Sequence, residues 1–218
     1  MPNHQTYFRN HGKAARFPWS LYHLPLLKHL ERFLGQNSFT GEKSVLVVGP
    51  GELHELSMLK HYGYRPSVAD IDERTLNQLK EQQPEEIDSY YLINEKFQGY
   101  PDTKKFDAIY AKEVIEHIPD SVAFLKKMKA LLKPGGKIWL STPNYGYFLL
   151  PFLEATFLEL VARFSGFTRR GIHPNKFNAE KFEQELVQSG FGEIKIFHTP
   201  GQLALCGQGT NSDLDPAI

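Results

Sequence analysis

The densest group of side chains that could do chemistry lies in the segment EVIEHI, which contains Glu113, Glu116 and His117. If this segment is helical, the i, i+3 and i+4 spacing puts the three side chains on one face. Two carboxylates and an imidazole make a mixed oxygen and nitrogen site for a divalent metal, and His173 of the later segment GIHPNKF is a further candidate ligand. Without a metal, His117 or His173 is a candidate general base, because imidazole titrates near neutral pH. The alternative is structural: Glu116 caps or pairs locally, and His117 hydrogen-bonds within the fold.

A second candidate site is the glycine turn in VLVVGPGEL, where Gly49 and Gly51 follow an apolar run. Glycine accepts positive φ and has no side chain that would keep a ligand away from backbone amides. Asp70 follows about twenty residues later, at the end of the next apolar run, where an acid can accept hydrogen bonds from ribose hydroxyls. The alternative role for Asp70 is a helix N-cap, which Asp72 could also supply. Nicotinamide dinucleotides and S-adenosylmethionine are the two cofactors that suit such an arrangement.

Both candidate sites must be positioned by an alternation of short strands and longer helices. Runs typical of strands lie at 44–49, 66–70, 89–95, 106–112, 136–142, 193–199 and 202–208, and helical spacing lies at 52–63, 73–83, 121–136 and 178–191. The alternation predicts a Rossmann-like, doubly wound α/β fold: a mostly parallel seven-stranded sheet with helices on both faces. Right-handed crossovers bring the carboxyl ends of the parallel strands to one edge, where ligands bind in such sheets.

Composition narrows the classes of function. The 218 residues are enough for one sizeable core, and Lys+Arg and Asp+Glu both number 25, for a formal net charge of +0. DNA binding is not expected and RNA binding is disfavoured, because nucleic-acid binders usually carry a basic excess. The single cysteine, Cys206, cannot form an internal disulfide, which fits a reducing compartment. The polar N-terminus lacks the apolar core of a signal peptide, and Pro151 and two glutamates break the most apolar stretch, so we expect a cytoplasmic protein.

Three later stretches carry a family resemblance. FDAIYAKEVIEHIPD, LLKPGGKIWLSTPN and KFNAEKFEQELVQSGF resemble, in order and spacing, the class I S-adenosylmethionine-dependent methyltransferases, and the resemblance covers residues 44–208. Locally the sequence is most similar to the ubiquinone-biosynthesis type of O-methyltransferase. Those enzymes carry a similar E-x-x-E-H stretch, an S-T-P-N at the fifth strand and an apolar insertion before a G-x-H segment. The small-RNA 3′-end 2′-O-methyltransferases share the E-x-x-E-H and T-P-N elements.

The resemblance implies S-adenosylmethionine as the cofactor and suggests a part for each candidate residue. The implied contacts are Gly49, Gly51, Ala111 and Lys112 at the methionine end, Asp70 at the ribose, and Asn94 or Glu95 at the adenine. Ile71, next to Asp70, is a further implied cofactor contact. In both enzyme groups the acidic-histidine cluster accompanies a divalent metal at the acceptor hydroxyl. This implies a Mg²⁺ ion held by Glu113, Glu116, His117 and His173.

Two positions depart from the family pattern. Val47 stands where an acid commonly helps to organise the methionine amine, and Leu53 stands where a third glycine is usual. Glu52 or Glu55 could supply the missing charge nearby.

The main prediction is methyl transfer to a hydroxyl of a small-molecule acceptor. A catalytically inactive binding protein on the same fold and an RNA 2′-O-methyltransferase remain as alternatives.

We divide the chain into a helical cap segment at 1–40, a cofactor-binding domain at 41–208 and a loose tail at 209–218. The domain contains an apolar insertion at 145–175, which is rich in Phe, Tyr and Leu. This insertion could form a lid over an apolar acceptor or make a peripheral contact with a membrane. It could equally belong to the core or form a homodimer face. Asn144 and Tyr145 are candidate contacts to the acceptor.

Overall fold

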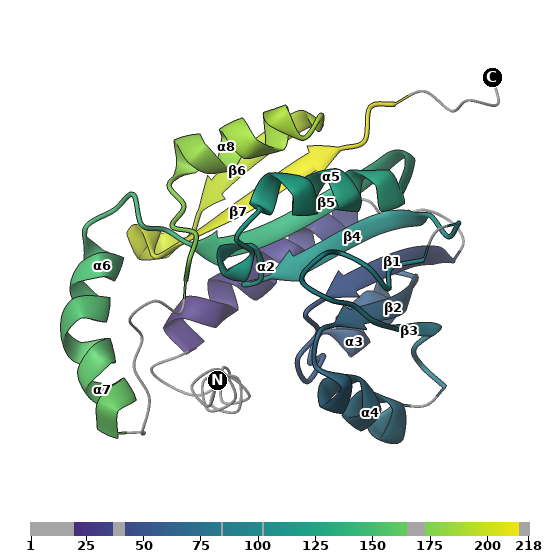
Figure 1. The fold of residues 1–218 in the computed structure, drawn as a ribbon, viewed down its shortest axis with the longest axis horizontal. Helices are drawn as coiled ribbons and strands as arrows, with labels where there is room; N and C mark the ends of the chain where they lie inside the picture. The colour runs from purple at the N-terminus through teal and green to yellow at the C-terminus, as the bar shows by residue number, and fades with distance from the viewer. Residues whose placement is uncertain (1–19, 37–41, 84, 102, 165–172, 214–218) are drawn as a thin grey trace.

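The computed structural model describes residues 20–36, 42–83, 85–101, 103–164 and 173–213. Within these ranges the chain forms a central β-sheet with helices on both sides (Figure 1). None of the helices in this part of the chain is long and apolar enough to cross a bilayer.

The sheet has seven strands in the order β3-β2-β1-β4-β5-β7-β6. The strands are β1 Lys43–Val48, β2 Tyr64–Asp70, β3 Ser89–Leu92, β4 Phe106–Lys112, β5 Leu132–Pro143, β6 Gly192–His198 and β7 Ala204–Thr210. The first five pair in parallel, whereas β7 runs antiparallel to both β5 and β6. This confirms the predicted mostly parallel, doubly wound sheet.

Helices cover both faces of the sheet. They are α2 Ser20–Gln36, α3 Leu56–His61, α4 Glu73–Gln82, α5 Ser121–Leu131, α6 Leu149–Leu153, α7 Glu159–Phe164 and α8 Ala179–Gln188. Three short turns complete the set: the 3₁₀ turns η1 Ile115–His117 and η3 Pro200–Gln202 and the π-helical turn η2 Glu154–Leu158.

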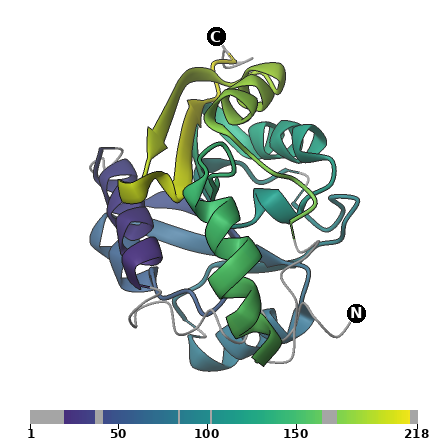
Figure 2. The same ribbon diagram turned by 90° about the vertical axis from the view of Figure 1, so that its left-hand side faces the viewer.

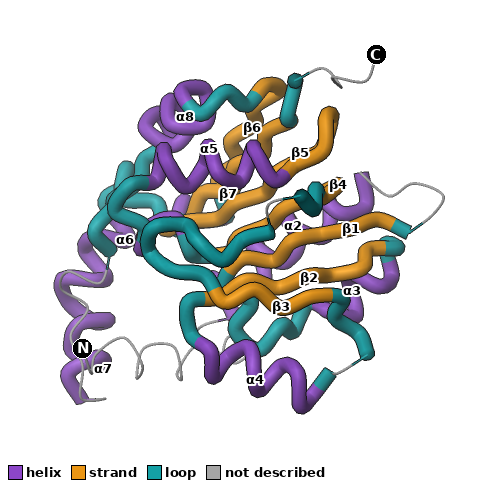
Figure 3. The backbone as a smooth tube through the Cα atoms, turned by 45° about the vertical axis from the view of Figure 1, so that its right-hand side comes forward, coloured by secondary structure: helices purple, strands orange, loops and turns teal. Residues whose placement is uncertain are grey.

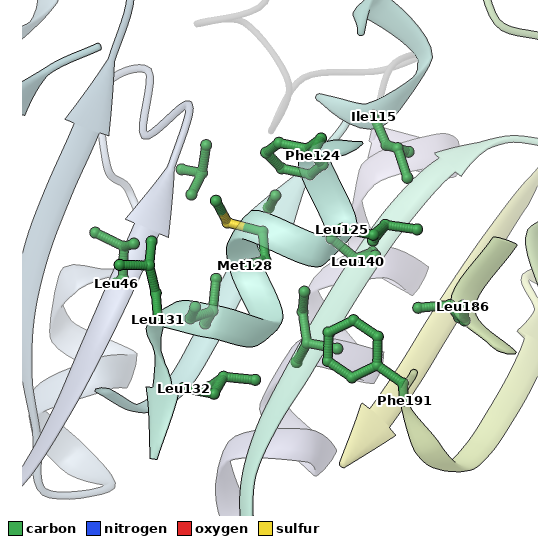
Figure 4. Close-up of a cluster of buried hydrophobic side chains, with 14 of the residues drawn as sticks. Leu46, Ile115, Phe124, Leu125, Met128, Leu131, Leu132, Leu140, Leu186 and Phe191 are labelled. Atoms are coloured by element: carbon green, nitrogen blue, oxygen red, sulfur yellow. The ribbon is translucent and has the colours of Figure 1, made fainter. Parts of the chain in front are cut away.

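Alternate residues of each central strand point into two separate cores, as the period of a strand requires. Leu46 and Val48 of β1 join the core under α5 and α8, where Met128 of α5 packs against the sheet (Figure 4). Val45 and Val47 join the core under α2, α3 and α4 on the opposite face. Burial on both faces explains why the strands read as almost continuous apolar runs.

One boundary differs from the prediction at the start of β5. The helix predicted over 121–136 ends at Leu131, and β5 begins at Leu132. Leu132 pairs with Phe106 of β4, and the side chain amide of Asn211 donates to the Leu132 carbonyl at 3.3 Å. Strand pairing therefore takes up the residues before the Pro-Gly turn, which lies inside β5 and does not end the helix.

One end of the predicted division differs from the structure. In the predicted cap the described helix is α2, and residues 1–19 lie outside the described residues. In the segment predicted to be a loose tail, β7 continues to Thr210 and Asn211 is buried, so the sheet extends into this segment. Residues 214–218 lie outside the described part.

The insertion forms α6, η2 and α7, which follow one another as a single rod beside the body of the sheet (Figures 1 and 2). Phe148, Phe152, Leu160 and Phe164 on this rod are exposed. These four side chains lie outside the core, while Leu150 of α6 is buried, so the role of the insertion stays a prediction.

Candidate functional site

Three of the predicted cofactor residues lie at or just after the carboxyl ends of neighbouring parallel strands. Val48 at the end of β1 pairs with Ala69 of β2 on one side and with Ala111 of β4 on the other. Figure 3 shows these strands side by side. Gly49, Asp70 and Lys112 are thus brought together at one edge of the sheet, which is where doubly wound folds bind ligands.

The glycine turn has the backbone conformation that the sequence predicts. Gly49 and Gly51 have φ values of 65° and 54°, in the left-handed region that favours glycine. A Cβ on Gly49 would lie 2.6 Å from Cγ2 of Val114, whereas a Cβ on Gly51 would meet nothing within 4 Å. Leu53, at φ 46°, is fully buried in the core under α3. The turn therefore packs on the segment after β4 through Gly49 and is open at Gly51.

Asp70 combines a local structural contact with an unusual electrostatic environment. Its carboxylate accepts the backbone N–H of Asp72 at 2.8 Å, while Asp72 caps α4 by accepting the Arg74 N–H at 3.0 Å. Burial raises the pKa of the Asp70 carboxyl to about 6, against the lowering effect of backbone hydrogen bonds. Because Asp72 is the N-cap of α4, Asp70 is not needed for that role, and the neighbouring Ile71 side chain is exposed.

The two candidates for the adenine end are exposed residues in a turn after β3. The Asn94 side chain oxygen accepts the backbone N–H groups of Lys96 and Gln98 at 2.9 and 3.1 Å, which holds the turn together. Glu95 is also exposed. Since Asn94 is engaged within its own turn, a contact from it to a ligand would have to use its backbone or displace these bonds.

At the methionine end, the structure separates the two glutamates that could replace the missing strand acid. Glu52 lies at the surface and pairs with His54, with 2.9 Å between the carboxylate and the imidazole nitrogen. Glu55 is buried, and its Oε1 accepts a hydrogen bond from Nζ of Lys112 at the end of β4. Ala111 is buried in the sheet core.

The acidic-histidine segment is not an α-helix. Glu113 has a φ of 58°, and only Ile115–His117 form a 3₁₀ turn, so the predicted common face does not arise. The structure instead brings Glu116, His117 and His173 together, with one potential ligand atom from each within 4.8 Å of the others. The two imidazole rings are 4.9 Å apart and nearly perpendicular.

Glu116 is the unusual member of this cluster. It is completely buried, and neither carboxylate oxygen has a hydrogen-bond partner among the described residues. Burial raises the pKa of the Glu116 carboxyl well above its usual range, and the Glu113 carboxylate raises it further. The Thr142 hydroxyl opposes this rise from nearby but does not reach hydrogen-bond geometry. A buried carboxyl group in this state would gain strongly from a cation beside it.

Glu113 lies outside this cluster and is held by hydroxyl groups. Tyr22 of α2 donates to Glu113 Oε2 at 2.6 Å, and Ser141 of β5 donates to Oε1 at 2.8 Å. These contacts join the N-terminal helix to the strand ends.

Contacts at both ends of the insertion explain how His173 reaches the cluster. The Tyr145 N–H donates to the Phe177 carbonyl at 2.7 Å, and the Asn175 N–H donates to the Glu116 carbonyl at 3.1 Å. The Tyr145 hydroxyl lies 2.5 Å from Nδ1 of His173 and donates to Glu154 at 3.1 Å. The start and end of the insertion are therefore pinned at the site, and Tyr145 orients the His173 ring.

The sequence does not predict several polar contacts at this edge. The Glu55–Lys112 pair, the Tyr22–Glu113 contact and the Tyr145–His173 contact all join residues far apart in the sequence. No short motif signals them, because each depends on how separate elements meet in space.

Comparisons with known proteins identify the family and the fold. A family model described as a methyltransferase domain matches residues 20–195. The ubiquinone biosynthesis O-methyltransferase of Coxiella burnetii (strain Dugway 5J108-111) is 29% identical over 144 residues, which cover 66% of this chain and 59% of that protein. The protein of the same name from Xanthomonas oryzae pv. oryzae (strain PXO99A) is 50% identical over 42 residues, 19% of this chain and 18% of that one. In the longer of these matches the chain thus spans less than two thirds of its relative.

Solved structures show the same fold. An O-methyltransferase family protein from Burkholderia thailandensis has a TM-score of 0.64 and 12% identity, covering 87% of this chain and 57% of that one. An S-adenosylmethionine-dependent methyltransferase from Mesorhizobium loti has a TM-score of 0.60 and 15% identity, covering 83% and 95%. The glycine turn, the acid at the end of β2, the sheet order and the family match lead to one conclusion: this chain belongs to the methyltransferase-domain family of S-adenosylmethionine-dependent enzymes.

Proposed function

We propose that the protein transfers the methyl group of S-adenosylmethionine to a hydroxyl group of a small-molecule acceptor. The observation that carries this proposal is the cluster of Glu116, His117 and His173, which combines a buried carboxyl group with two imidazoles. Val114, which is two residues before Glu116, packs on Gly49 of the glycine turn. The cluster is therefore close to the turn where we expect the cofactor. The printed names of the curated relatives, which are O-methyltransferases, also support the proposal.

The chemistry requires alignment and removal of one proton. The acceptor oxygen attacks the methyl carbon in line with the C–S bond, that bond breaks, and its electron pair stays on sulfur to give S-adenosylhomocysteine. The hydroxyl proton must leave, and His117 or His173 is the candidate base that would take it. Contact with the Tyr145 hydroxyl would keep the His173 ring in one orientation during this transfer.

The cluster also fits a divalent cation. Glu116 would supply a carboxylate oxygen and His117 and His173 one nitrogen each, while the described position of Glu113 is outside this group. A cation bound there would lower the pKa of an acceptor hydroxyl. Two imidazoles with one carboxylate suit Mn²⁺, Fe²⁺ or Zn²⁺ at least as well as Mg²⁺, which prefers oxygen ligands. The ions to be tested should therefore include these metals.

An acceptor assay tests the proposal. Purified protein with radiolabelled S-adenosylmethionine should methylate members of a panel of phenols and catechols. A chemical treatment that cleaves methyl ethers should release the label, which shows that the methyl group is on oxygen. Parallel reactions contain a chelator, each of the four metals, or a short RNA with a free 2′-hydroxyl. Methylation of RNA alone would favour the RNA alternative. Binding of S-adenosylhomocysteine without transfer to any hydroxyl, nitrogen or carbon acceptor would favour an inactive binding protein.

We further propose that the rod formed by α6, η2 and α7 contacts a lipid surface from which an apolar acceptor could be drawn. Its exposed side chains include Phe152 and Phe164, the latter 86% exposed. Each phenylalanine that becomes buried in lipid contributes about 1.5–3 kcal/mol. Phe152→Ser with Phe164→Ser should therefore lower the fraction that floats with phosphatidylcholine vesicles by roughly tenfold or more.

The control for this experiment is Val187→Ser, which removes an exposed apolar side chain from α8 on another part of the molecule. It should leave flotation unchanged. Sedimentation velocity of the same variants tests whether the rod is instead a homodimer face. If the two serine substitutions convert a dimer to a monomer and leave vesicle binding as it was, the rod is a homodimer face and the lipid proposal is wrong.

A further inference from the structure

The buried ion pair between Glu55 and Lys112 lies near a position where the resemblance leads us to expect an acid. That position is Val47, in β1, and its side chain is fully buried in the core under α3. Tyr110 of β4 lies in the same core, and Lys112 is two residues further along that strand, hence on the same face. The pair is therefore on the face toward which an acid at position 47 would point.

The position of the pair along the sheet matches the cofactor turn. Val48 pairs with Ala111, so the next residues, Gly49 and Lys112, are neighbours at the end of the two strands. Glu55 immediately precedes α3, on the other side of the glycine turn. The Lys112 side chain thus reaches from β4 to α3 beside the turn that the cofactor's methionine end would occupy.

The two charged groups differ in their exposure. The Glu55 side chain is 3% exposed and the Lys112 side chain 25% exposed. Burying such a pair is costly unless its remaining donors and acceptors are used, and a pair of this kind adds little to stability by itself. One contact between them leaves two ammonium hydrogens and further carboxylate lone pairs for a ligand.

We propose that Glu55 and Lys112 together bind the amino-acid end of S-adenosylmethionine. The α-ammonium group of the ligand would lie against the Glu55 carboxylate, and its α-carboxylate against the Lys112 ammonium. A net-neutral pair then receives a net-neutral zwitterion, and every charge has an opposite neighbour. Glu55, just before α3, in this way supplies the charge absent from position 47. The proposal rests on the assignment of the cofactor and concerns recognition of one part of it.

The test compares two ligands in one protein. S-adenosylhomocysteine carries the amino-acid end, and 5′-methylthioadenosine has the same nucleoside and sulfur without it. Lys112→Met alone would leave a buried carboxylate unpaired and endanger folding. The double variant Glu55→Gln with Lys112→Met removes both charges and leaves none uncompensated.

We expect calorimetric titration to show S-adenosylhomocysteine affinity lowered roughly 30- to 100-fold in the double variant, because two charge-assisted contacts are lost. Affinity for 5′-methylthioadenosine should change less than about threefold, which makes the loss specific to the amino-acid end. The matched control is Lys60→Met with Glu86→Gln, an exposed pair 2.9 Å apart at the end of α3. That variant should bind both ligands like the unmodified protein.

Different failures point to different errors. If the double variant binds both ligands as tightly as the unmodified protein, or loses affinity for both equally, the pair has only a structural role and the inference is wrong. If the unmodified protein binds neither ligand, the cofactor assignment itself fails, and the inference fails with it. Titration of the unmodified protein with both ligands therefore tests the cofactor assignment before any variant is made.

Discussion

Asp70→Asn is expected to weaken cofactor binding and, at neutral pH, to make the unliganded protein more stable. Asparagine keeps an oxygen that can accept the Asp72 N–H, so the local turn is preserved. It loses the charge that would hold the ribose hydroxyls, and each charge-assisted hydrogen bond is worth about 1.5–3 kcal/mol. Affinity for S-adenosylhomocysteine should therefore fall by roughly 10- to 100-fold or more.

The stability effect follows from the pKa of this carboxyl group. Burial raises the pKa of Asp70 to about 6 from an ordinary value of 3.8. The folded protein thus holds this proton more tightly than the unfolded chain, so the contribution of Asp70 to the free energy of unfolding falls as pH rises from about 4 to about 6 and then stays level. At pH 7 the ionised group costs stability on the order of 3 kcal/mol, which asparagine removes.

Urea denaturation at several pH values measures this effect. The variant should exceed the unmodified protein in stability at pH 7, and the two should converge as pH falls toward 4. Asp72→Asn, an exposed N-cap in the same loop, is the matched control and should leave the affinity unchanged. Because the Asp72 charge helps to raise the Asp70 pKa, this variant should reduce the pH dependence of Asp70 without removing it. Unchanged affinity in Asp70→Asn would remove Asp70 from the cofactor site.

Glu116→Gln is expected to abolish stabilisation by a divalent cation. In the unmodified protein, a metal present at 100 times its dissociation constant should raise the free energy of unfolding by about 2.7 kcal/mol. For a chain of this size that corresponds to a rise of roughly 5–10 °C in Tm. The variant should show no such rise, because the neutral amide is a poor replacement for the only carboxylate in the cluster.

Without metal, the same variant should be about as stable as the unmodified protein. The raised pKa of the Glu116 carboxyl favours its neutral form, and glutamine is a neutral group of the same shape. In the acceptor assay with metal, the rate should fall at least 10- to 100-fold, since changes in groups that only support metal ligands already cost that much.

Glu113→Gln tests whether the metal site has three ligand residues or four. The described contacts of Glu113 are with Tyr22 and Ser141, so this variant should retain metal affinity within a few fold. An equal loss of metal affinity in both glutamine variants would show that Glu113 joins the ligands when the ion is bound. Equal activity of Glu116→Gln with and without chelator, at the level of the unmodified protein, would exclude a metal role for the cluster.

Local patterns in the sequence predicted much of the fold. The apolar runs of β1, β2 and β4 are buried on both faces, and such runs separated by helical spacing have few arrangements other than a parallel sheet covered on two sides. The β5 boundary was wrong because pairing with Phe106 and the contact from Asn211 come from distant parts of the chain. Such contacts override the local preference of the residues before a Pro-Gly turn.

For the candidate site, the amino-acid sequence by itself determined the turn at Gly49 and Gly51 and the acid at the end of β2. Each depends on the conformation of a few consecutive residues and on the common direction of parallel strands. Only the tertiary structure decided which side chains meet. Glu113 has positive φ and contacts Tyr22 and Ser141, whereas His173 lies in the cluster with Glu116 because both ends of the insertion are held beside β5. Lys112 donates a hydrogen bond to Glu55 across the glycine turn. Such meetings depend on strand register and on the path of loops, and these are set by the energy of the whole packed core rather than by neighbours in the sequence.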